Sequence, residues 1–311
     1  MRAVRCREGQ VELVDLPAPR GDGIHVRIRS AGICGSDLHL LGSGLPLPNT
    51  LGHEMAGVAP DGRAVAIEPL LPCGACAPCR SGSYNLCERG PSIVIGLAHD
   101  GGMADEIVVP ERCLVPLPAA VAAGDACLIE PLAVAIHGMQ RAGLRGDTRV
   151  AIVGGGSIGL CAVAVARAAG AEVALLARHD AQRAAGERLG AVAPSGSYEL
   201  VVDAAGTKSA LADALALCRP GARLLLLGSY WDGFELSGLL LCMKEIDVVP
   251  ASMYGRRGAA RDVDVAAATL AARPEIARTI ITHRFPLDAA AEAFRTAADR
   301  RSGAIKVVLE P

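Results

Sequence analysis

The sequence predicts an α/β protein with two domains, one rich in β-strands and one built on a doubly wound parallel sheet. Three observations lead to this prediction. The chain has 311 residues, which is long enough for two domains of ordinary size. Up to about residue 130, glycine or proline interrupts short apolar runs at intervals of about ten residues. From Arg149 onward, apolar strands alternate with helical segments.

In the β-rich part, short strands separated by turns are typical of a small barrel or sandwich. The runs that predict strands there are Val11–Leu16, Ile24–Ile28, Ala64–Ile67 and Ile107–Val109. After Gly255 the pattern changes again and mixes both kinds of element. The expected elements are helices near Val263–Ala272 and Leu287–Thr296, and strands at Thr279–His283 and Ala304–Leu309.

The alternating segment predicts a parallel sheet, because a helix between two strands returns the chain to the same edge of the sheet. The expected strands are Val150–Val153, Val173–Ala177, Leu200–Asp203 and Arg223–Leu227. The expected helices are Ser157–Ala169, Ala181–Leu189 and Ser209–Cys218.

Composition and charge exclude several classes of protein. The formal net charge is -2 with both signs interspersed, so neither a nucleic-acid surface nor a basic membrane-binding face is expected. The longest apolar runs, such as Leu224–Leu227, are too short to cross a bilayer. Charges throughout Met1–Gln10 leave no signal-peptide core. We therefore expect a cytoplasmic protein.

Four of the eleven cysteines predict a closed metal site. Cys73, Cys76 and Cys79 are separated by two residues each, and Cys87 follows shortly after. Two-residue gaps allow a turning backbone to direct successive sulfur atoms at one centre, and four thiolates match tetrahedral zinc. No βαβ context surrounds the group, which argues against redox chemistry. With no open coordination position, this zinc would be structural.

A second group is dispersed along the chain. Cys34, His53 and Glu130 would supply three protein ligands and leave a fourth position for water or substrate, which is the arrangement of a catalytic zinc. From spacing alone, core packing is the more common explanation of a cysteine near a histidine than metal binding.

Five segments occur in the order seen in the medium-chain zinc alcohol dehydrogenases: Gly32–His39, Gly52–Glu54, Cys73–Cys87, Glu130–Gly138 and Val150–Gly159. The chain resembles this family over essentially its whole length, most of all the sorbitol and threonine dehydrogenase branch. The resemblance implies a GroES-like catalytic domain of residues 1–133 and 255–311, and a Rossmann domain of residues 134–254. It also implies a homodimer or homotetramer.

The same resemblance implies roles for the residues around the dispersed site. Cys34 and His53 would bind the catalytic zinc, and Glu54 would lie at or near it. Glu130 stands where many relatives have a second cysteine, and it would bind directly or through water.

Three side chains near these ligands take supporting roles in the family. Asp37 would sit behind His53 and hold its ring, although a turn residue is the alternative. Ser36 and His39 resemble the proton relay of the family, which carries the alcohol proton to solvent.

A glycine-rich turn between the first strand of the alternating segment and its helix predicts a dinucleotide site. In this GxGxxG pattern, Gly154 would make the tight turn, Gly156 would let the backbone approach the pyrophosphate, and Gly159 would let helix and strand pack closely. The amides at the helix start, Ser157 and Ile158, would then meet the phosphates.

The end of the next strand bears on which cofactor binds. NAD-binding sheets usually place an acid there for the ribose 2′-hydroxyl, but Ala177 occupies that position and Arg178 and His179 follow. Because arginine pairs well with phosphate, we predict NADP(H). Stacking of Arg178 on the adenine is the alternative. Lys306 matches a basic residue that reaches the pyrophosphate in relatives, or is a solvated strand charge.

Taken together, these features predict a zinc-dependent oxidoreductase with two zinc ions per chain. It would transfer a hydride between a secondary alcohol or polyol, or the ketone, and NADP(H). The alternatives are a dehydrogenase of an amino alcohol or biosynthetic cyclitol that uses NAD(H), a non-catalytic zinc-stabilised nucleotide-binding protein, and a zinc-free reductase of the same superfamily. The chain is shorter than typical relatives, with losses in connections such as 57–63.

Overall fold

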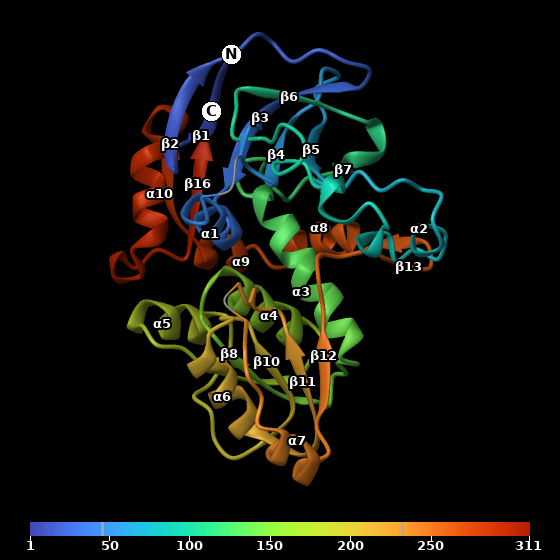
Figure 1. Cartoon of the computed structure of the whole chain (residues 1–311), viewed down its shortest axis with the longest axis vertical. Helices are drawn as coiled ribbons and strands as arrows, with labels where there is room; N and C mark the ends of the chain where they lie inside the picture. Colours follow the sequence, from blue (N-terminus) through green and yellow to red (C-terminus); the bar gives the residue numbers. More distant parts are fainter. Residues whose placement is uncertain (45–46, 232) are drawn as a thin grey trace. The chain divides into compact units, whose positions relative to one another are not determined.

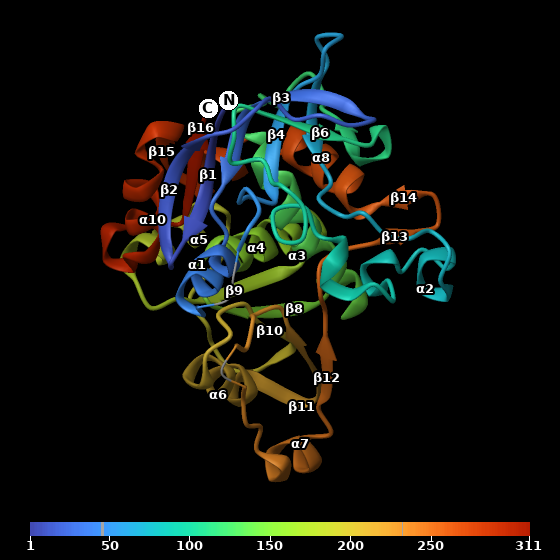
Figure 2. The ribbon, with the colours of Figure 1, turned by 45° about the horizontal axis from the view of Figure 1, so that its top comes forward.

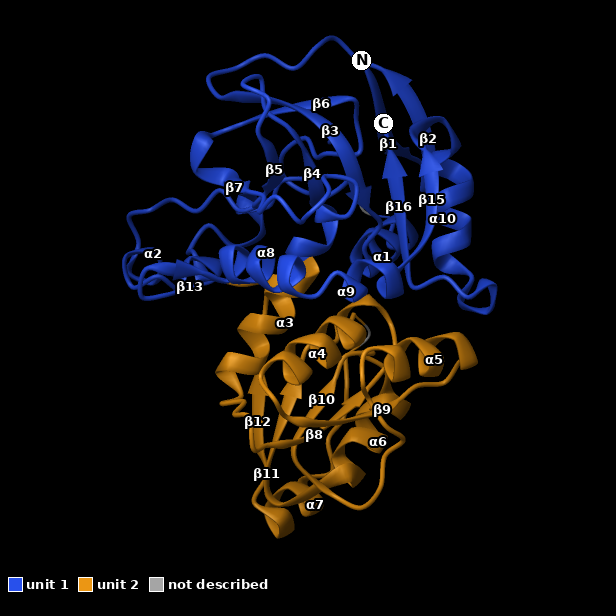
Figure 3. Ribbon diagram, turned by 180° about the vertical axis from the view of Figure 1, so that it is seen from behind, with its two compact units in different colours: residues 1–130, 255–311 blue, residues 131–254 orange. Residues whose placement is uncertain are grey.

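The computed structural model describes residues 1–44, 47–231 and 233–311. It divides into two compact units (Figure 3). Unit 1 consists of Met1–Glu130 and Gly255–Pro311, and unit 2 consists of Pro131–Tyr254. The division expected from the sequence, after residue 133, falls a little further along helix α3 (Ile129–Arg141), which begins in unit 1.

Unit 1 is built around a seven-stranded sheet of the order β15-β16-β3-β4-β5-β7, with β6 also paired to β3 (Figure 1). The long central strand β3 shows why these segments are strands: Val26 and Ile28 point into the core, while the alternate residues Arg27 and Arg29 point to solvent. The strands are β3 (Ile24–Gly32), β4 (Glu54–Val58), β5 (Ala64–Ile67), β6 (Glu106–Val109), β7 (Leu114–Pro116), β15 (Ile281–Pro286) and β16 (Lys306–Glu310).

The remaining elements of unit 1 surround this sheet. A hairpin of β1 (Arg2–Arg7) and β2 (Gln10–Asp15) lies beside α10 (Ala290–Ala298) (Figure 2). The core of this unit is mostly aliphatic and includes Phe294 of α10. The other elements are α1 (Gly35–Gly42), α2 (Ala77–Arg80), α8 (Asp262–Ala272), α9 (Glu275–Ile280), β13 (Arg256–Arg257) and β14 (Ala260–Arg261).

Unit 2 contains a parallel sheet of the order β12-β11-β10-β8-β9. Helices cover both faces, so the central strands are apolar without alternation. The strands are β8 (Arg149–Val153), β9 (Glu172–Leu176), β10 (Tyr198–Asp203), β11 (Cys218–Leu226) and β12 (Asp247–Pro250). The helices, besides α3, are α4 (Ser157–Ala168), α5 (Asp180–Arg188), α6 (Lys208–Leu217) and α7 (Gly238–Lys244).

A sixth strand of this sheet is reduced to one residue. Val192 follows α5 and forms an isolated parallel bridge with Ala174 of β9. Its amide donates to Val173 O at 3.0 Å, and its carbonyl accepts from Leu175 N at 2.9 Å. With Val192 counted as the third strand, the order becomes 3-2-1-4-5-6, which is the Rossmann order. The doubly wound α/β class predicted from the sequence is confirmed.

Candidate active site

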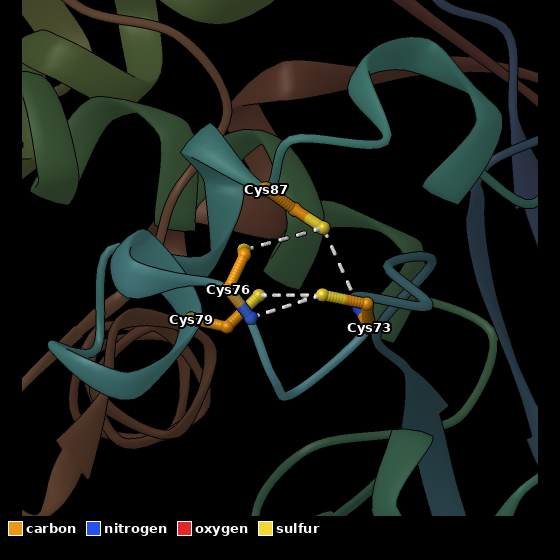
Figure 4. A group of neighbouring side chains, drawn as sticks. All are labelled: Cys73, Cys76, Cys79 and Cys87. Carbon is orange, nitrogen blue, oxygen red and sulfur yellow. Dashed lines mark hydrogen bonds between the residues drawn. The ribbon is translucent and has the colours of Figure 1, made fainter.

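The four cysteines of the predicted closed site come together in unit 1, on the loop that carries α2 and a 3₁₀ turn at Tyr84–Leu86 (Figure 4). All four sulfur atoms lie within 4.8 Å of one another. Cys73 Sγ is 3.8 Å from Cys79 Sγ, and Cys76 Sγ is 4.0 Å from Cys87 Sγ. Zinc–sulfur bonds of about 2.3 Å in a tetrahedron place sulfur atoms about 3.8 Å apart, so the group fits zinc.

Backbone amides surround these sulfur atoms. The amides of Ala75 and Cys76 both donate to Cys73 Sγ at 3.4 Å, and Cys73 N donates to Cys87 Sγ at 3.4 Å. The amide hydrogen bonds lower the pKa of the Cys73 thiol to about 6 and also lower the pKa of Cys87. Amide donors favour thiolates, and thiolates are the form that binds a metal.

A buried polar network holds this lobe against the rest of unit 1. Tyr84, between Cys79 and Cys87, donates its hydroxyl to Glu68 Oε1 and lies 3.0 Å from Gly255 O. Arg261, just before α8, donates to Glu68 Oε2 at 3.0 Å. The lobe is therefore fixed by groups far away in the sequence as well as by its own turns.

The second donor group consists of Cys34, His53 and Glu54, whose ligand atoms also lie within 4.8 Å of one another. Cys34 is the N-cap of α1, at the end of β3, and Glu54 begins β4. Gly32 of β3 pairs with Glu54, so the register of these two strands brings the three side chains together.

The ring of His53 is oriented from both sides. Asp37 Oδ1 lies 3.6 Å from Nδ1, and Asp37 Oδ2 accepts from the Cys34 amide at 2.9 Å. Ser36 Oγ lies 3.5 Å from Nε2. Burial lowers the pKa of His53, but Asp37 and Cys34 raise it, and the net pKa lies well above 6.5. With Nδ1 facing a carboxylate, Nε2 is the nitrogen left for a metal.

Glu54 is buried and forms an ion pair with Lys306 of β16. Each is 1% exposed, and Lys306 Nζ lies 2.7 Å and 2.5 Å from the two carboxylate oxygens and 3.0 Å from Ile33 O. A Cβ on Gly32 would lie 2.2 Å from Glu54 Oε2, so only glycine leaves room for this pair. The expectations for Lys306 are corrected: it is not a solvated charge, and its ammonium is held by Glu54 and Ile33 instead of reaching outward.

Glu130 lies outside the group of mutually close donor atoms. It is half-buried at the start of α3, and burial raises the pKa of its carboxyl to about 7, although the charge of His53 lowers it. Glu130 is therefore near His53, with Glu54 closer to the other two ligands. His39, the second residue of the predicted relay, is exposed in the last turn of α1.

In unit 2, the glycine-rich turn has the geometry that the motif demands. Gly154 has φ +106°, a conformation that favours glycine. A Cβ on Gly159 would lie 1.8 Å from Gly154 O, so the start of α4 packs directly on the turn. A Cβ on Gly156 would meet nothing within 4 Å, which leaves space beside this backbone. The helix therefore presents its first amides, at Ser157 and Ile158, beside open space.

The end of β9 carries the predicted determinant of the cofactor. Ala177 is buried and Arg178 is exposed, with Arg178 Nη2 3.4 Å from Ser209 Oγ at the start of α6. His179 is the N-cap of α5. Arg183 Nη1 donates to the carbonyls of Ala177 and Arg178, both at 2.9 Å, and so holds the turn.

One group at these sites was missed by sequence reasoning. The Glu54–Lys306 pair joins residues far apart along the chain, and only a charged residue inside an apolar strand hinted at it. Asp203 ends an apolar strand, and from the sequence it matches a position that contacts the cofactor in the family. It is buried and accepts the hydroxyl of Tyr230 at 2.7 Å, a partner that the sequence did not predict.

Known proteins with similar sequences share both units. Residues 20–119 match the alcohol dehydrogenase GroES-like domain, and residues 157–269 match the zinc-binding dehydrogenase domain. The L-galactonate-5-dehydrogenase of Escherichia coli K12 is 31% identical over 329 aligned positions, which cover 94% of each chain.

Solved structures agree along the whole chain. A zinc-binding dehydrogenase of Sinorhizobium meliloti 1021 bound to NADP has 29% identity and a TM-score of 0.87, and the match covers 100% of this chain and 99% of that one. An alcohol dehydrogenase of Escherichia coli CFT073 complexed with NADH has 26% identity, a TM-score of 0.87 and the same coverage. In the part of the chain that the structure describes, no helix has the length and apolar character to span a membrane.

Three findings indicate the same family. They are the two domain matches, the relative that covers nearly all of the chain, and the two donor clusters. The protein is an oxidoreductase that acts on CH–OH groups, and the chain belongs to the polyol branch of the medium-chain zinc-dependent alcohol dehydrogenases.

Proposed function

We propose that this protein transfers a hydride between a secondary alcohol of a polyol-like substrate, or the corresponding ketone, and NADP(H). The observation that carries the proposal is the cluster of Cys34, His53 and Glu54, in which Asp37 directs one histidine nitrogen inward. A zinc ion held there supplies a Lewis acid for the substrate oxygen. The L-galactonate-5-dehydrogenase of Escherichia coli, the relative that covers nearly the whole chain, supports a polyhydroxylated substrate.

Within this function, the chain's own residues bind the metal and move the proton. Cys34 and His53 bind, Asp37 orients the His53 ring, and Glu130 completes the site directly or through water. Ser36 Oγ, beside Nε2 of His53, accepts the proton of the substrate hydroxyl and releases its own hydroxyl proton toward His39. From there His39, on the exposed side of α1, passes the proton to solvent.

Two zinc ions per chain are supported by the two donor clusters. Metal analysis of the purified enzyme is expected to give two zinc ions per chain. A value well under two would favour the zinc-free reductase.

Solved relatives carry either NADP or NADH, so the fold alone does not decide between the two cofactors. The residues at the end of β9 support a preference for NADP(H). Ala177 provides no carboxylate for the ribose, and the exposed Arg178 provides a guanidinium for a 2′-phosphate.

Arg178→Ala is expected to weaken NADPH binding about ten-fold or more and NADH binding little. Arg188→Ala, an exposed arginine at the other end of α5, is the matched control. Tighter binding of NADH by the wild type would refute the preference.

Turnover with a panel of polyols, amino alcohols, cyclitols and ketones then tests the substrate class. We expect polyols with a secondary alcohol to be the best substrates, and the Cys34→Ala variant to be inactive on all of them. A best substrate among amino alcohols or cyclitols would replace the polyol proposal.

A homo-oligomer is supported by apolar surface in unit 2. Leu239 and Met243 of α7 are 73% and 75% exposed, and Trp231 and Phe234 are exposed in the preceding loop. Next to them β12 is the edge strand of the sheet. Exposed apolar patches and open sheet edges are typical of subunit interfaces. Light scattering is expected to give two or four times the mass of the chain, and Leu239→Asp is expected to lower it.

A further inference from the structure

The ends of three neighbouring strands in unit 2 are joined by direct backbone contacts. Ala204 N donates to Val153 O at 2.9 Å, which joins β10 to β8. Leu227 N and Gly228 N both donate to Asp203 O at 2.9 Å, which joins β11 to β10. These are the carboxyl ends of parallel strands, the edge where open α/β sheets bind their ligands.

Two tight approaches show that the turns after these strands have little freedom. A Cβ on Gly154, in the glycine-rich turn, would lie 2.9 Å from Ala205 Cβ. A Cβ on Gly228 would lie 2.3 Å from Gly206 N. The turn after β10 is thus packed between the glycine-rich turn on one side and the turn after β11 on the other.

One buried carboxylate connects the side chains of this edge. Asp203 is 0% exposed, and its Oδ1 accepts from the amides of Ala205 at 2.8 Å and Gly206 at 3.1 Å. Its Oδ2 accepts from the hydroxyl of Tyr230 at 2.7 Å. Tyr230 belongs to the turn after β11 and packs on Phe234, with ring centroids 4.6 Å apart. One oxygen therefore shapes the β10 turn, and the other holds the β11 turn to it.

The hydroxyl remains a donor over the working range of pH. Burial, and next the hydrogen bond to Asp203, raise the pKa of Tyr230 well above its usual value. A buried carboxylate that loses such a partner is costly, because an unpaired ionised oxygen is poorly solvated inside the protein.

We propose that Tyr230 is a positioning residue for the nicotinamide cofactor. Through its hydrogen bond to Asp203, Tyr230 holds the turn after β11 against the turn after β10, and so preforms the edge of the sheet that binds the dinucleotide. The inference rests on the proposed function, because it assigns no new ligand. Neither side chain needs to touch the reacting atoms. Loss of the bond should therefore raise the Kd and KM of the cofactor and leave kcat nearly unchanged.

The test compares two Tyr→Phe variants in the same unit. Tyr230→Phe removes the hydroxyl that holds the edge. Tyr198→Phe removes a buried hydroxyl at the opposite, amino end of β10, where it accepts from Ser195 N at 2.8 Å. We expect Tyr230→Phe to weaken NADPH binding about ten-fold, as the loss of a hydrogen bond to a charged group implies, and Tyr198→Phe to change it by less than about two-fold.

Trp231 supplies the readout. It is the only tryptophan of the chain and follows Tyr230 directly. Quenching of its emission by NADPH, through energy transfer to the reduced nicotinamide, gives the Kd without turnover. In the cofactor-free enzyme, we also expect Tyr230→Phe, but not Tyr198→Phe, to shift the Trp231 emission, because the turn that carries it is released.

Asp203→Asn is the second variant, for the case that Tyr230→Phe does not fold. It keeps an oxygen for the turn amides and replaces a charge-assisted bond with a neutral one, which is about half as strong. We expect a loss of NADPH affinity of about three-fold, again with kcat unchanged.

The outcomes separate the inference from the proposed function. If the wild type binds neither NADPH nor NADH, the proposed function is wrong. If the wild type binds and Tyr230→Phe binds equally well, or if Tyr198→Phe loses as much affinity, only the role of Tyr230 is refuted. A fall in kcat with an unchanged KM would also overturn it.

Discussion

The two clusters of candidate metal ligands in unit 1 are constructed in opposite ways. The four-cysteine lobe takes all its ligands from residues 73–87, and amides of the same loop donate to its sulfur atoms. The site of Cys34, His53 and Glu54 takes its ligands from two chain segments, and its buried counter-charge, Lys306, comes from the last strand.

The difference teaches that only the site of Cys34, His53 and Glu54 depends on the correct pairing of strands in the sheet. Gly32 pairs with Glu54 of β4 on one side and with Val308 of β16 on the other. A slip of either register by one residue would reverse the side chains and separate Glu54 from Lys306. The lobe does not depend on such pairing, although Tyr84 and Arg261 attach it to the unit.

The largest effect that distinguishes the two clusters is expected from substitution of His53, and it is a loss of activity. His53→Ala should lower kcat/KM at least about 10³-fold, because it removes a proposed ligand of the catalytic metal. Asp37→Asn should cost about 10- to 100-fold, because the ring loses its partner while the ligand remains. Steady-state kinetics of the zinc-loaded enzyme measure both, and His25→Ala, at an exposed position of β3, is the control. Equal losses for Asp37→Asn and His25→Ala would contradict the role of Asp37.

The next effect concerns stability at the assembled site. Lys306→Met should lower the free energy of unfolding by about 3–5 kcal/mol, since it leaves Glu54 as a buried charge without a partner. The double variant Glu54→Gln with Lys306→Met should recover part of the loss, because no lone charge remains. Urea unfolding measures both quantities. A single variant as stable as the wild type would show that the pair does not stabilise the fold.

A more local effect is expected at the lobe. Cys73→Ser should lower the zinc content by one ion per chain and expose residues 73–87 to proteolysis. Because the assembled site keeps its register, kcat should fall less than about ten-fold. Metal analysis, limited proteolysis and kinetics follow the three changes, with Cys113→Ala as the control for loss of a buried thiol. A loss of activity as large as that of His53→Ala would mean that the two regions are not independent.

The smallest effect is the pH dependence of the metal-free protein. Burial raises the pKa of Glu130 to about 7, so the folded chain retains a proton that the unfolded chain releases above its ordinary pKa of 4.5. The stabilising contribution is complete below pH 4.5 and is lost as the pH rises toward about 7, with a slope of at most about 1.4 kcal/mol per pH unit. His53, whose pKa is raised well above 6.5, acts with the same sign, but its contribution is complete below pH 6.5 and is lost only above it.

Urea unfolding of the chelator-treated protein across this range measures the slope. Glu130→Gln should flatten it between pH 4.5 and 6.5 and leave only the part above pH 6.5 that His53 contributes. A slope of the opposite sign would show that Glu130 is not buried in this way.

Several elements could be predicted because their signals are local. The strand, glycine turn and helix of 150–168 occur where expected, since each residue of the motif has a steric reason, such as the 1.8 Å that would separate a Cβ of Gly159 from Gly154 O. Other elements were misjudged for the same reason. Thr279–His283 was expected to be one strand, but Thr279 and Ile280 end α9 before β15 begins at Ile281. A run of β-branched residues does not mark the point where a helix gives way to a strand.

By itself, the sequence determined the α/β class, the four-cysteine lobe and the glycine-rich turn, because short spacing and local backbone geometry decide them. Tertiary structure alone decided the surroundings of Glu54 and the partners of Lys306 and Asp203. Each of these groups is buried and charged or strongly polar, and its partner is chosen by strand register and by which turns meet at a sheet edge. Those pairings exist only once distant segments have been brought together, so no local pattern can specify them.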